Sequence, residues 1–168
     1  MSNQVFSSRL YKLRTVLSAQ GLDGIFITNL TSIRYICGFT GSAASCLITQ
    51  DDSYFISDGR YDVQSGEQVQ NMERFIDFGP HISIVAKNNL IQNGLNLAFE
   101  GDHTSVSQYR AMTDAFPKVN WKSTSMLMEN LQAVKDKSEL DAIRTAVEIT
   151  DAVYAEILPM LKPGTTEK

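Results

Sequence analysis

Histidine and cysteine are scarce in this sequence, and their scarcity argues against several kinds of site. Among 168 residues there are two histidines, His81 and His103, and two cysteines, Cys37 and Cys46. Neither histidine belongs to an H-x-x-x-H or similar pattern, so a metal hydrolase centre, which needs several His or carboxylate ligands together, is not indicated. The cysteines form neither a zinc knuckle nor a C-x-x-C pair. Their apolar neighbours predict buried, reduced thiols that pack as small hydrophobic side chains.

An excess of positive charge and a long hydrophobic run are also missing. The sequence has 15 Lys and Arg against 19 Asp and Glu, a formal net charge of -4, and the two signs are interspersed. This pattern argues against a nucleic-acid partner. No apolar run has the length of a membrane-spanning helix, and the N-terminus MSNQVFSSRLYKLR lacks the apolar segment of an export signal. We therefore expect no membrane contact and a cytoplasmic location.

Short apolar segments alternate with helical patterns through residue 131, in a composition that is 43% hydrophobic and 20% charged. The polar turn Gln50–Asp52 joins two of the apolar segments, so part of the sheet is expected to be antiparallel. These patterns predict an α/β domain over residues 1–131, with a mixed sheet of about six strands flanked by helices. The predicted strands lie at 22–28, 46–49, 53–57, 74–78, 95–100 and 119–123, and the predicted helices at 6–17, 61–72, 82–91 and 104–116.

The C-terminal segment, residues 132–168, has a different pattern. From Ser138 an apolar stripe at helical spacing predicts one long helix, with Ser138 and Asp141 as an approximate capping box. Part of this stripe has no obvious element in the sequence to pack on. Pro163 and Gly164 then stop the helix, and residues 165–167 carry signals for the start of another. We interpret this ending as a sign of a truncated polypeptide.

Two groups of residues suggest chemistry only weakly. Glu100, Asp102 and His103 follow a predicted strand, and they are interpreted as a polar turn before a helix or, alternatively, as a catalytic cluster. Ser42 and Ser45 lie near glycines, but GSAAS is not the G-x-S-x-G pattern of a serine hydrolase. The neighbouring GFTGS lacks the lysine of a phosphate-binding loop. His81 follows Pro80 at a predicted helix start, which favours an exposed histidine.

A third polar group, in SDGRYDVQSGEQ, follows directly on a predicted strand. Arg60 stands between Asp58 and Asp62, and such an arginine commonly makes a planar, bidentate ion pair that fixes a loop. The alternative is that Arg60 or Tyr61 projects from the strand end toward a peptide or a carboxylate. The residues alone therefore indicate an α/β domain without an active site of its own.

Three stretches in fixed order resemble the N-terminal domain of the creatinase, prolidase and aminopeptidase P family, and together they cover the chain. IRYICGFTGS resembles the family's Tyr-Leu-x-Gly-Phe-x-Gly-Ser pattern, and DGRYDVQSGEQV its Asp-x-Arg-Tyr-x-x-Gln-Ala pattern. LQAVKDKSELDAIRTAVEITD and the tail LKPGTTE are similar to the family's linker and to the opening of its catalytic domain. Ser65 and Gln132 depart from these patterns, where the family has Ala and often Arg, and Ala43 and Ala44 follow Ser42 where many relatives have a glycine nearby.

The resemblance implies the family's N-terminal fold, with its ribonuclease H-like motif, in a parent enzyme that hydrolyses Xaa-Pro bonds as an Xaa-Pro dipeptidase (prolidase) or aminopeptidase P. It also implies a pita-bread catalytic domain after Lys168, with two divalent metal ions, manganese or cobalt, whose five ligands all lie beyond this sequence. No catalytic residue, metal ligand or cofactor is then expected in residues 1–168, and this fragment should be inactive alone.

The resemblance further implies a homodimer in which this domain contacts its own catalytic domain and gates access of Xaa-Pro peptides to a partner's active site. A non-catalytic peptide-binding or protein-binding module and the N-terminal domain of a creatinase-like amidinohydrolase remain alternatives. The loop from Arg34 to Ser42 could equally pack within its own domain. The candidates for gating or dimer contact are Arg34, Tyr35, Phe39, Thr40, Gly41, Ser42, Asp58, Arg60 and Tyr61.

Overall fold

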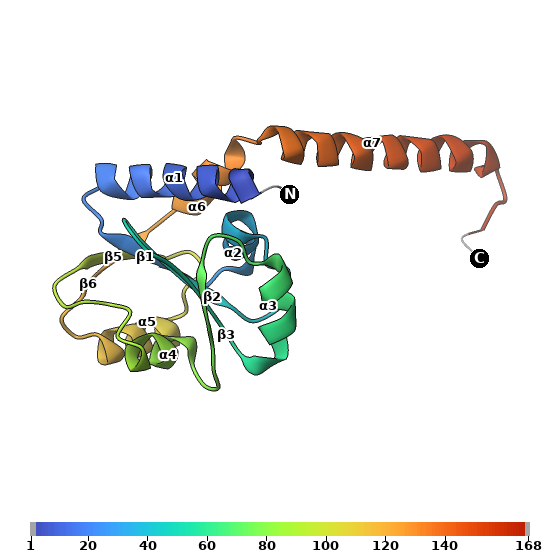
Figure 1. The fold of residues 1–168 in the computed structure, drawn as a ribbon. Helices are drawn as coiled ribbons and strands as arrows, with labels where there is room; N and C mark the ends of the chain where they lie inside the picture. The colour runs from blue at the N-terminus through green and yellow to red at the C-terminus, as the bar shows by residue number, and fades with distance from the viewer. Residues whose placement is uncertain (1–2, 167–168) are drawn as a thin grey trace. The chain divides into compact units, whose positions relative to one another are not determined.

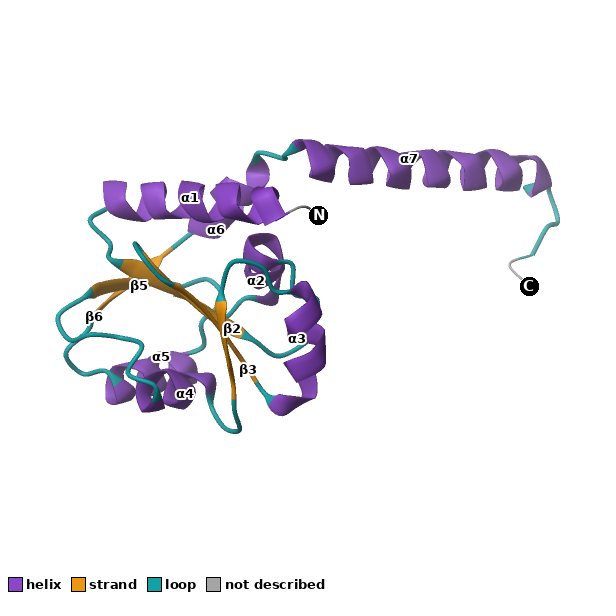
Figure 2. Cartoon of the chain, in the orientation of Figure 1, coloured by secondary structure: helices purple, strands orange, loops and turns teal. Residues whose placement is uncertain are grey.

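The computed structural model describes residues 3–166, and its contacts divide the chain into two compact units, Met1–Gln132 and Ala133–Lys168. The first unit has the predicted α/β fold, in which helices cover a mixed, six-stranded sheet (Figures 1 and 2). None of the helices within residues 3–166 is long and apolar enough to cross a membrane.

The sheet has the strand order β4-β3-β2-β1-β5-β6. Strand β2 pairs antiparallel with β1 and with β3, whereas the β3–β4, β1–β5 and β5–β6 pairs are parallel. The predicted antiparallel hairpin between the second and third strands is therefore confirmed. The strands are β1 (Gly24–Ile27), β2 (Ser45–Thr49), β3 (Ser53–Ser57), β4 (Glu73–Ile76), β5 (Asn96–Glu100) and β6 (Asn120–Thr124).

The helices of this unit form two layers: α1, α2 and α6 lie on one face of the sheet, and α4 and α5 lie on the other (Figure 1). Helix α3 follows a single 3-10 turn, η1, after β3. The helices are α1 (Asn3–Ala19), α2 (Leu30–Cys37), η1 (Gly59–Tyr61), α3 (Asp62–Gln68), α4 (His81–Lys87), α5 (Val106–Ala115) and α6 (Leu127–Ala133).

Alternation of side chains along the strands produces two separate cores, as expected for a sheet covered on both faces. On β1, Ile25 and Ile27 face the first core, together with leucines of α1, while Phe26 faces the second. The remaining strands divide in the same way, which fixes their register, because a slip by one residue would exchange the two faces. The first core also contains Cys37, Cys46, Phe39 and Phe55, and the second contains Leu47, Ile56, Leu97 and Met112.

Two short helices were not predicted. Helix α2 begins after Asn29, whose side chain accepts a hydrogen bond from the backbone N–H of Thr31, and ends at Gly38, which has a left-handed backbone with φ 86°. Residues 34–37, predicted to be part of a loop, are therefore its last turn. Helix α6 was also missed, and α3 and α4 are shorter than the predicted helices at 61–72 and 82–91.

The second unit contains α7 (Lys137–Ile157) and a short 3-10 turn, η2 (Leu158–Met160). The long helix was predicted, but its capping box was wrong by two residues: Asp136 is the N-cap and Glu139 is its partner, because Asp136 accepts the N–H of Glu139. No residue of α7 is buried, and its apolar stripe is exposed. The predicted helix start at residues 165–167 extends to Glu167, which lies outside the described residues.

Candidate functional site

Two loops that carry most of the candidate residues meet at one end of the strands β2 and β3. Because β2 runs antiparallel to β3, the loop that enters β2 and the loop that leaves β3 lie at the same end of the two strands. The first loop connects α2 to β2 and carries Phe39, Thr40, Gly41 and Ser42. The second is residues 58–61, from Asp58 through η1. We call these two loops, together with α3, the candidate rim.

The ring of Phe39 packs beneath the candidate rim. Its side chain is 1% exposed, and its ring makes edge-to-face contacts with Phe55 at 4.8 Å and with Tyr61 at 5.4 Å between centroids. Gly41 lies against the same two rings of Phe39 and Tyr61, since a Cβ atom at position 41 would come within 2.7 Å of Cε1 of Tyr61. Glycine is therefore required here for close approach, and Phe39 cannot itself be a surface contact.

Ser42 and Tyr61 are joined by hydrogen bonds on the exposed side of the candidate rim. Their hydroxyl oxygens are 2.6 Å apart, and the backbone N–H of Ser42 also donates to the Tyr61 hydroxyl at 3.3 Å. These hydrogen bonds are the main reason why the pKa of Tyr61 is lowered, and the nearby charge of Arg60 lowers it further. The phenol of Tyr61 is thus held in one place by packing beneath it and by polar contacts above.

Thr40 is held by two glutamines of α3. Its backbone N–H donates to Oε1 of Gln68 at 2.9 Å, and the Gln64 amide donates to the Thr40 hydroxyl at 3.1 Å. Gln64 also donates to Gln68 at 3.2 Å, so the three side chains form one network. Sequence reasoning did not single out Gln68. Its spacing of four residues from Gln64 on a helix was the only signal that could have indicated it.

Arg60 and Asp58 form the bidentate pair that the sequence predicted. Nε and Nη2 of Arg60 donate to Oδ1 and Oδ2 of Asp58, both at 2.9 Å. These hydrogen bonds lower the pKa of Asp58 to about 2. Asp62, on the other side of Arg60 in sequence, instead accepts from Arg74 through its backbone carbonyl at 2.8 Å. The Arg60 guanidinium remains largely exposed beside the Tyr61 ring, 5.4 Å from its centroid.

The other two candidates, Arg34 and Tyr35, lie on the last turn of α2. Tyr35 is 8% exposed and packs under the Arg9 guanidinium, 4.2 Å from the ring centroid, while its hydroxyl donates to the Leu131 carbonyl at 3.3 Å. Tyr35 is therefore occupied within its own domain. Arg34 is exposed and lines, with Thr40 and Glu67, an open hollow of about 330 Å³ beside the candidate rim.

The cluster that follows β5 does not form one catalytic group. Glu100 is buried and accepts hydrogen bonds from the Ser32 hydroxyl at 2.6 Å and from two backbone N–H groups at the start of α2. Burial raises its pKa in spite of these bonds. His103 is paired with Glu129 at 2.9 Å, and Asp102 accepts from residues before α6. These partners support the interpretation of a polar turn rather than of a catalytic cluster.

His81 and Ser45 form a pair that sequence reasoning missed. Nδ1 of His81 is 2.8 Å from Oγ of Ser45, and burial lowers the pKa of His81 while the charge of Asp58 opposes this shift. The prediction of an exposed histidine was wrong, because His81 is half-buried where α4 begins. Ser45 is 3% exposed, which leaves no space for a substrate at its hydroxyl.

Two of the departures from the family pattern, Ser65 and Gln132, have defined contacts. The hydroxyl of Ser65, on α3, is buried and accepts a hydrogen bond from Arg74 at 2.8 Å, so the serine holds a neighbouring side chain. The Gln132 amide lies 3.4 Å from the hydroxyl of Ser32.

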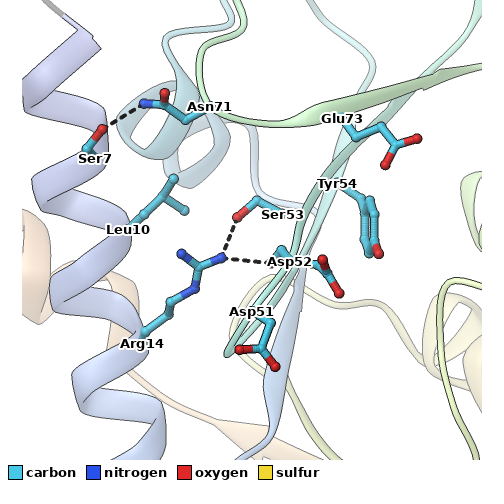
Figure 3. A pocket seen from close by; sticks show the side chains of 9 residues that line it. All are labelled: Ser7, Leu10, Arg14, Asp51, Asp52, Ser53, Tyr54, Asn71 and Glu73. Atoms are coloured by element: carbon cyan, nitrogen blue, oxygen red, sulfur yellow. Dashed lines mark hydrogen bonds between the residues drawn. The ribbon is translucent and has the colours of Figure 1, made fainter.

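A second open hollow, of about 340 Å³, lies at the other end of β2 and β3, between α1 and the turn before β3 (Figure 3). Arg14 crosses it and donates to the carbonyl groups of Thr49 and Asp52 and to the Ser53 hydroxyl, at 2.8–3.0 Å. Because all of these contacts bind α1 to the hairpin, Arg14 serves the fold. Residues 3–166 contain no group of three or more His, Cys, Asp or Glu that could hold a metal ion.

Comparisons with known proteins agree on one family. Residues 9–134 match the Creatinase/Prolidase N-terminal domain. The chain is 31% identical over 160 residues to the uncharacterised peptidase YqhT of Bacillus subtilis, a match that covers 95% of this chain and 45% of that protein. The structure of an Xaa-Pro dipeptidase from Bacillus anthracis is 34% identical, with a TM-score of 0.87 over 96% of this chain and 45% of that chain.

A third similar structure contains only the N-terminal domain of a relative. The structure of this domain from the cytoplasmic peptidase PepQ of Mycobacterium tuberculosis is 28% identical, with a TM-score of 0.67 over 74% of this chain and 98% of that chain. By contrast, the chain spans less than half the length of the curated relatives named as peptidases, 45% and 42%. The family match, together with the shared fold, shows that this chain belongs to the creatinase/prolidase N-terminal domain family.

Proposed function

We propose that this chain is the N-terminal domain of a proline-specific metallopeptidase, an Xaa-Pro dipeptidase or aminopeptidase P. One observation carries the proposal: nearly the whole chain, including α7, is similar in sequence and fold to the first 45% of an Xaa-Pro dipeptidase. Residues 1–131 are the domain proper, and residues 132–168 link it to the rest of the parent chain. A cytoplasmic location is proposed with it, since one relative is named as a cytoplasmic peptidase.

In this proposal the metal chemistry belongs to a catalytic domain that follows Lys168. The described residues lack a suitable set of ligands, so they do not fit a pair of manganese or cobalt ions. The domain instead serves dimerisation and limits which peptides reach a metal centre. Its partners are its own catalytic domain and a second copy of the parent chain.

The candidate rim is the part of this domain suited to substrate gating. Its exposed polar residues, Thr40, Ser42 and Arg60, each form a hydrogen bond with another residue of the candidate rim, and the buried ring of Phe39 packs beneath the rim. Because these side chains are already ordered, little conformational entropy is lost when they contact a peptide or a second subunit. Phe39 and Tyr35 act in this scheme as positioning residues, since both are buried.

The test is activity of the full-length parent chain with manganese on an Xaa-Pro dipeptide and on an Xaa-Pro tripeptide. We expect cleavage of at least one by the parent chain and of neither by residues 1–168. Cleavage of neither by the parent chain would contradict the proposal and favour a non-catalytic binding module. Hydrolysis of creatine by the parent chain would instead favour an amidinohydrolase.

The gating role has its own test in Arg60→Ala, with Arg110→Ala as the matched control. Arg110 is an exposed arginine on α5, which packs against the second core, whereas Phe39 and Tyr61 of the candidate rim pack in the first. A rim contact worth ~1 kcal/mol predicts that Arg60→Ala lowers kcat/KM about fivefold or weakens the dimer by a similar factor. The control should retain the kcat/KM and the dimer affinity of the unmodified protein. If the two variants have equal kcat/KM and equal dimer affinity by sedimentation, the gating role is refuted and the peptidase assignment is unaffected.

A further inference from the structure

The two cysteines of the chain lie together beneath the candidate rim. Cys37 is the last residue of α2 and Cys46 lies in β2, and these two elements pack on each other within the first core. Both are free thiols with side chains that are 0% exposed. The S–H of Cys37 donates a hydrogen bond to the Ile33 carbonyl at 3.2 Å, and the Cys46 thiol lies close enough to shift the pKa of Cys37.

The segment between these cysteines is the loop that carries Phe39, Thr40, Gly41 and Ser42. A bond between the two sulfurs would therefore join the two ends of this loop and close it into a ring. The pairing of Cys46 with Ile27 and with Phe55 on the neighbouring strands fixes one end of that ring in the sheet. Gly38, with its left-handed backbone, fixes the direction in which the chain leaves the other end.

We propose that Cys37 and Cys46 are a redox-sensitive pair, which a peroxide oxidises to a disulfide that restrains the loop of residues 38–45. In the first step the Cys37 thiolate attacks one oxygen of hydrogen peroxide, the O–O bond breaks, and Cys37 becomes a sulfenic acid as hydroxide leaves. In the second step the Cys46 sulfur attacks the Cys37 sulfur, the S–O bond breaks, and water leaves. Overall the two thiols lose two electrons and two protons, and peroxide is reduced to two molecules of water.

The environment of each sulfur assigns the two roles. The neighbouring Cys46 thiol lowers the pKa of Cys37, which favours its thiolate, whereas burial and then the nearby Cys37 sulfur raise the pKa of Cys46. Cys37 is therefore the attacking sulfur and Cys46 the resolving one. Because both are covered, peroxide reaches them only when the loop opens, so oxidation is slow and is accelerated by conditions that open the loop.

Formation of the disulfide does not depend on the proposed function, but its effect on peptidase activity does. If the candidate rim gates a peptidase, a loop closed at both ends changes the position of Thr40 and Ser42 and therefore kcat/KM. The oxidised domain should also unfold at a higher temperature, since the cross-link restricts the unfolded chain.

The experiment treats residues 1–168 with hydrogen peroxide and measures the mass of the tryptic peptide that spans residues 35–60, which contains both cysteines. The expected result is a loss of two hydrogen atoms from this peptide, reversed by dithiothreitol, in a protein that stays monomeric on non-reducing gels. No mass change, addition of two oxygen atoms, or a disulfide between chains would each overturn the proposal.

Single variants separate the two roles. Cys46→Ser should accumulate a sulfenic acid on Cys37 that dimedone traps, and Cys37→Ser should give no trapped product. If a serine variant fails to fold by circular dichroism, the alanine variant at the same position replaces it. Trapping at Cys46 alone would overturn the assignment of roles. An unchanged kcat/KM of the oxidised parent enzyme would overturn the regulatory consequence, whereas absence of peptidase activity in the reduced parent concerns the proposed function alone.

Discussion

Replacement of Gly41 by alanine tests whether the candidate rim depends on close packing of the loop against Phe39 and Tyr61. The added Cβ atom would lie 2.7 Å from a ring carbon of Tyr61 and closer still to the buried ring of Phe39. One of the two rings has to move, and Phe39 cannot move freely because it is 1% exposed and also packs on Phe55. Movement of Tyr61 separates its hydroxyl from Ser42, with which it now forms a hydrogen bond of 2.6 Å.

The expected cost follows from these contacts. Overpacking at such a position destabilises a protein by about 1–3 kcal/mol. For a domain of this size, each kcal/mol corresponds to a fall in Tm of roughly 3–5 °C, so Gly41→Ala should lower Tm by about 3–15 °C. Urea unfolding followed by circular dichroism measures the free energy, and NMR shifts of the Tyr61 ring report whether the ring has moved.

Gly59→Ala is the matched control, because it makes the same chemical change in the adjoining loop. A Cβ atom at position 59 would meet only the Phe78 ring, at an ordinary contact distance of 3.6 Å. We expect Gly59→Ala to change the free energy of unfolding by less than about 0.5 kcal/mol. If Gly41→Ala is no less stable than Gly59→Ala, the close packing of this loop is not what holds the candidate rim together.

Two further predictions concern buried titratable groups. Burial lowers the pKa of His81 from its ordinary 6.5, so its contribution to stability is fully present above that pH and is lost as the pH falls below it. The loss in free energy of unfolding between about pH 7.5 and 5.5 should therefore be smaller in His81→Gln, and an equal loss in both proteins would contradict this. Glu100→Gln leaves one acceptor oxygen where the carboxylate now accepts hydrogen bonds on both oxygens, from two backbone N–H groups and from the Ser32 hydroxyl, and should cost about 1–3 kcal/mol. Thermal unfolding measures this cost, with Glu129→Gln, at a more exposed carboxylate, as the control. Similar small losses of stability in both variants would refute the predicted cost of Glu100→Gln.

Periodicity alone predicted most of the sheet and the longer helices, because those elements carry a continuous apolar face, whether it is buried, as in α1, or exposed, as in α7. It failed at α2, where LTSIRYIC is short and rich in residues that also favour strands. The signals that mark this helix lie outside it, in the cap at Asn29 and the left-handed residue Gly38. At α7 the error was smaller, because several polar residues near Ser138 could serve as a cap, and the structure gives Asp136 the extended backbone that a cap requires.

The candidate site was predictable only where contacts follow from local sequence. Arg60 and Asp58 are two residues apart, so their ion pair could be expected from residue type and spacing. The pair of Ser45 and His81 joins residues 36 positions apart, and the contact of Gln68 with Thr40 spans 28. Such contacts depend on where α3 and α4 pack, which the apolar pattern of a short helix does not specify.

Strand direction explains why the loop before β2 and the loop after β3 form one surface. A hairpin between β2 and β3 was expected from the polar turn Gln50–Asp52, and the other ends of two antiparallel strands must lie together, at the edge away from their turn. The loops that carry Phe39 and Tyr61 therefore lie at the same end of these strands, although the two residues are far apart in sequence. What topology does not determine is how closely the two loops approach. That distance depends on the missing side chain of Gly41, which lets the rings of Phe39 and Tyr61 meet edge to face and brings Ser42 within hydrogen-bonding distance of the Tyr61 hydroxyl.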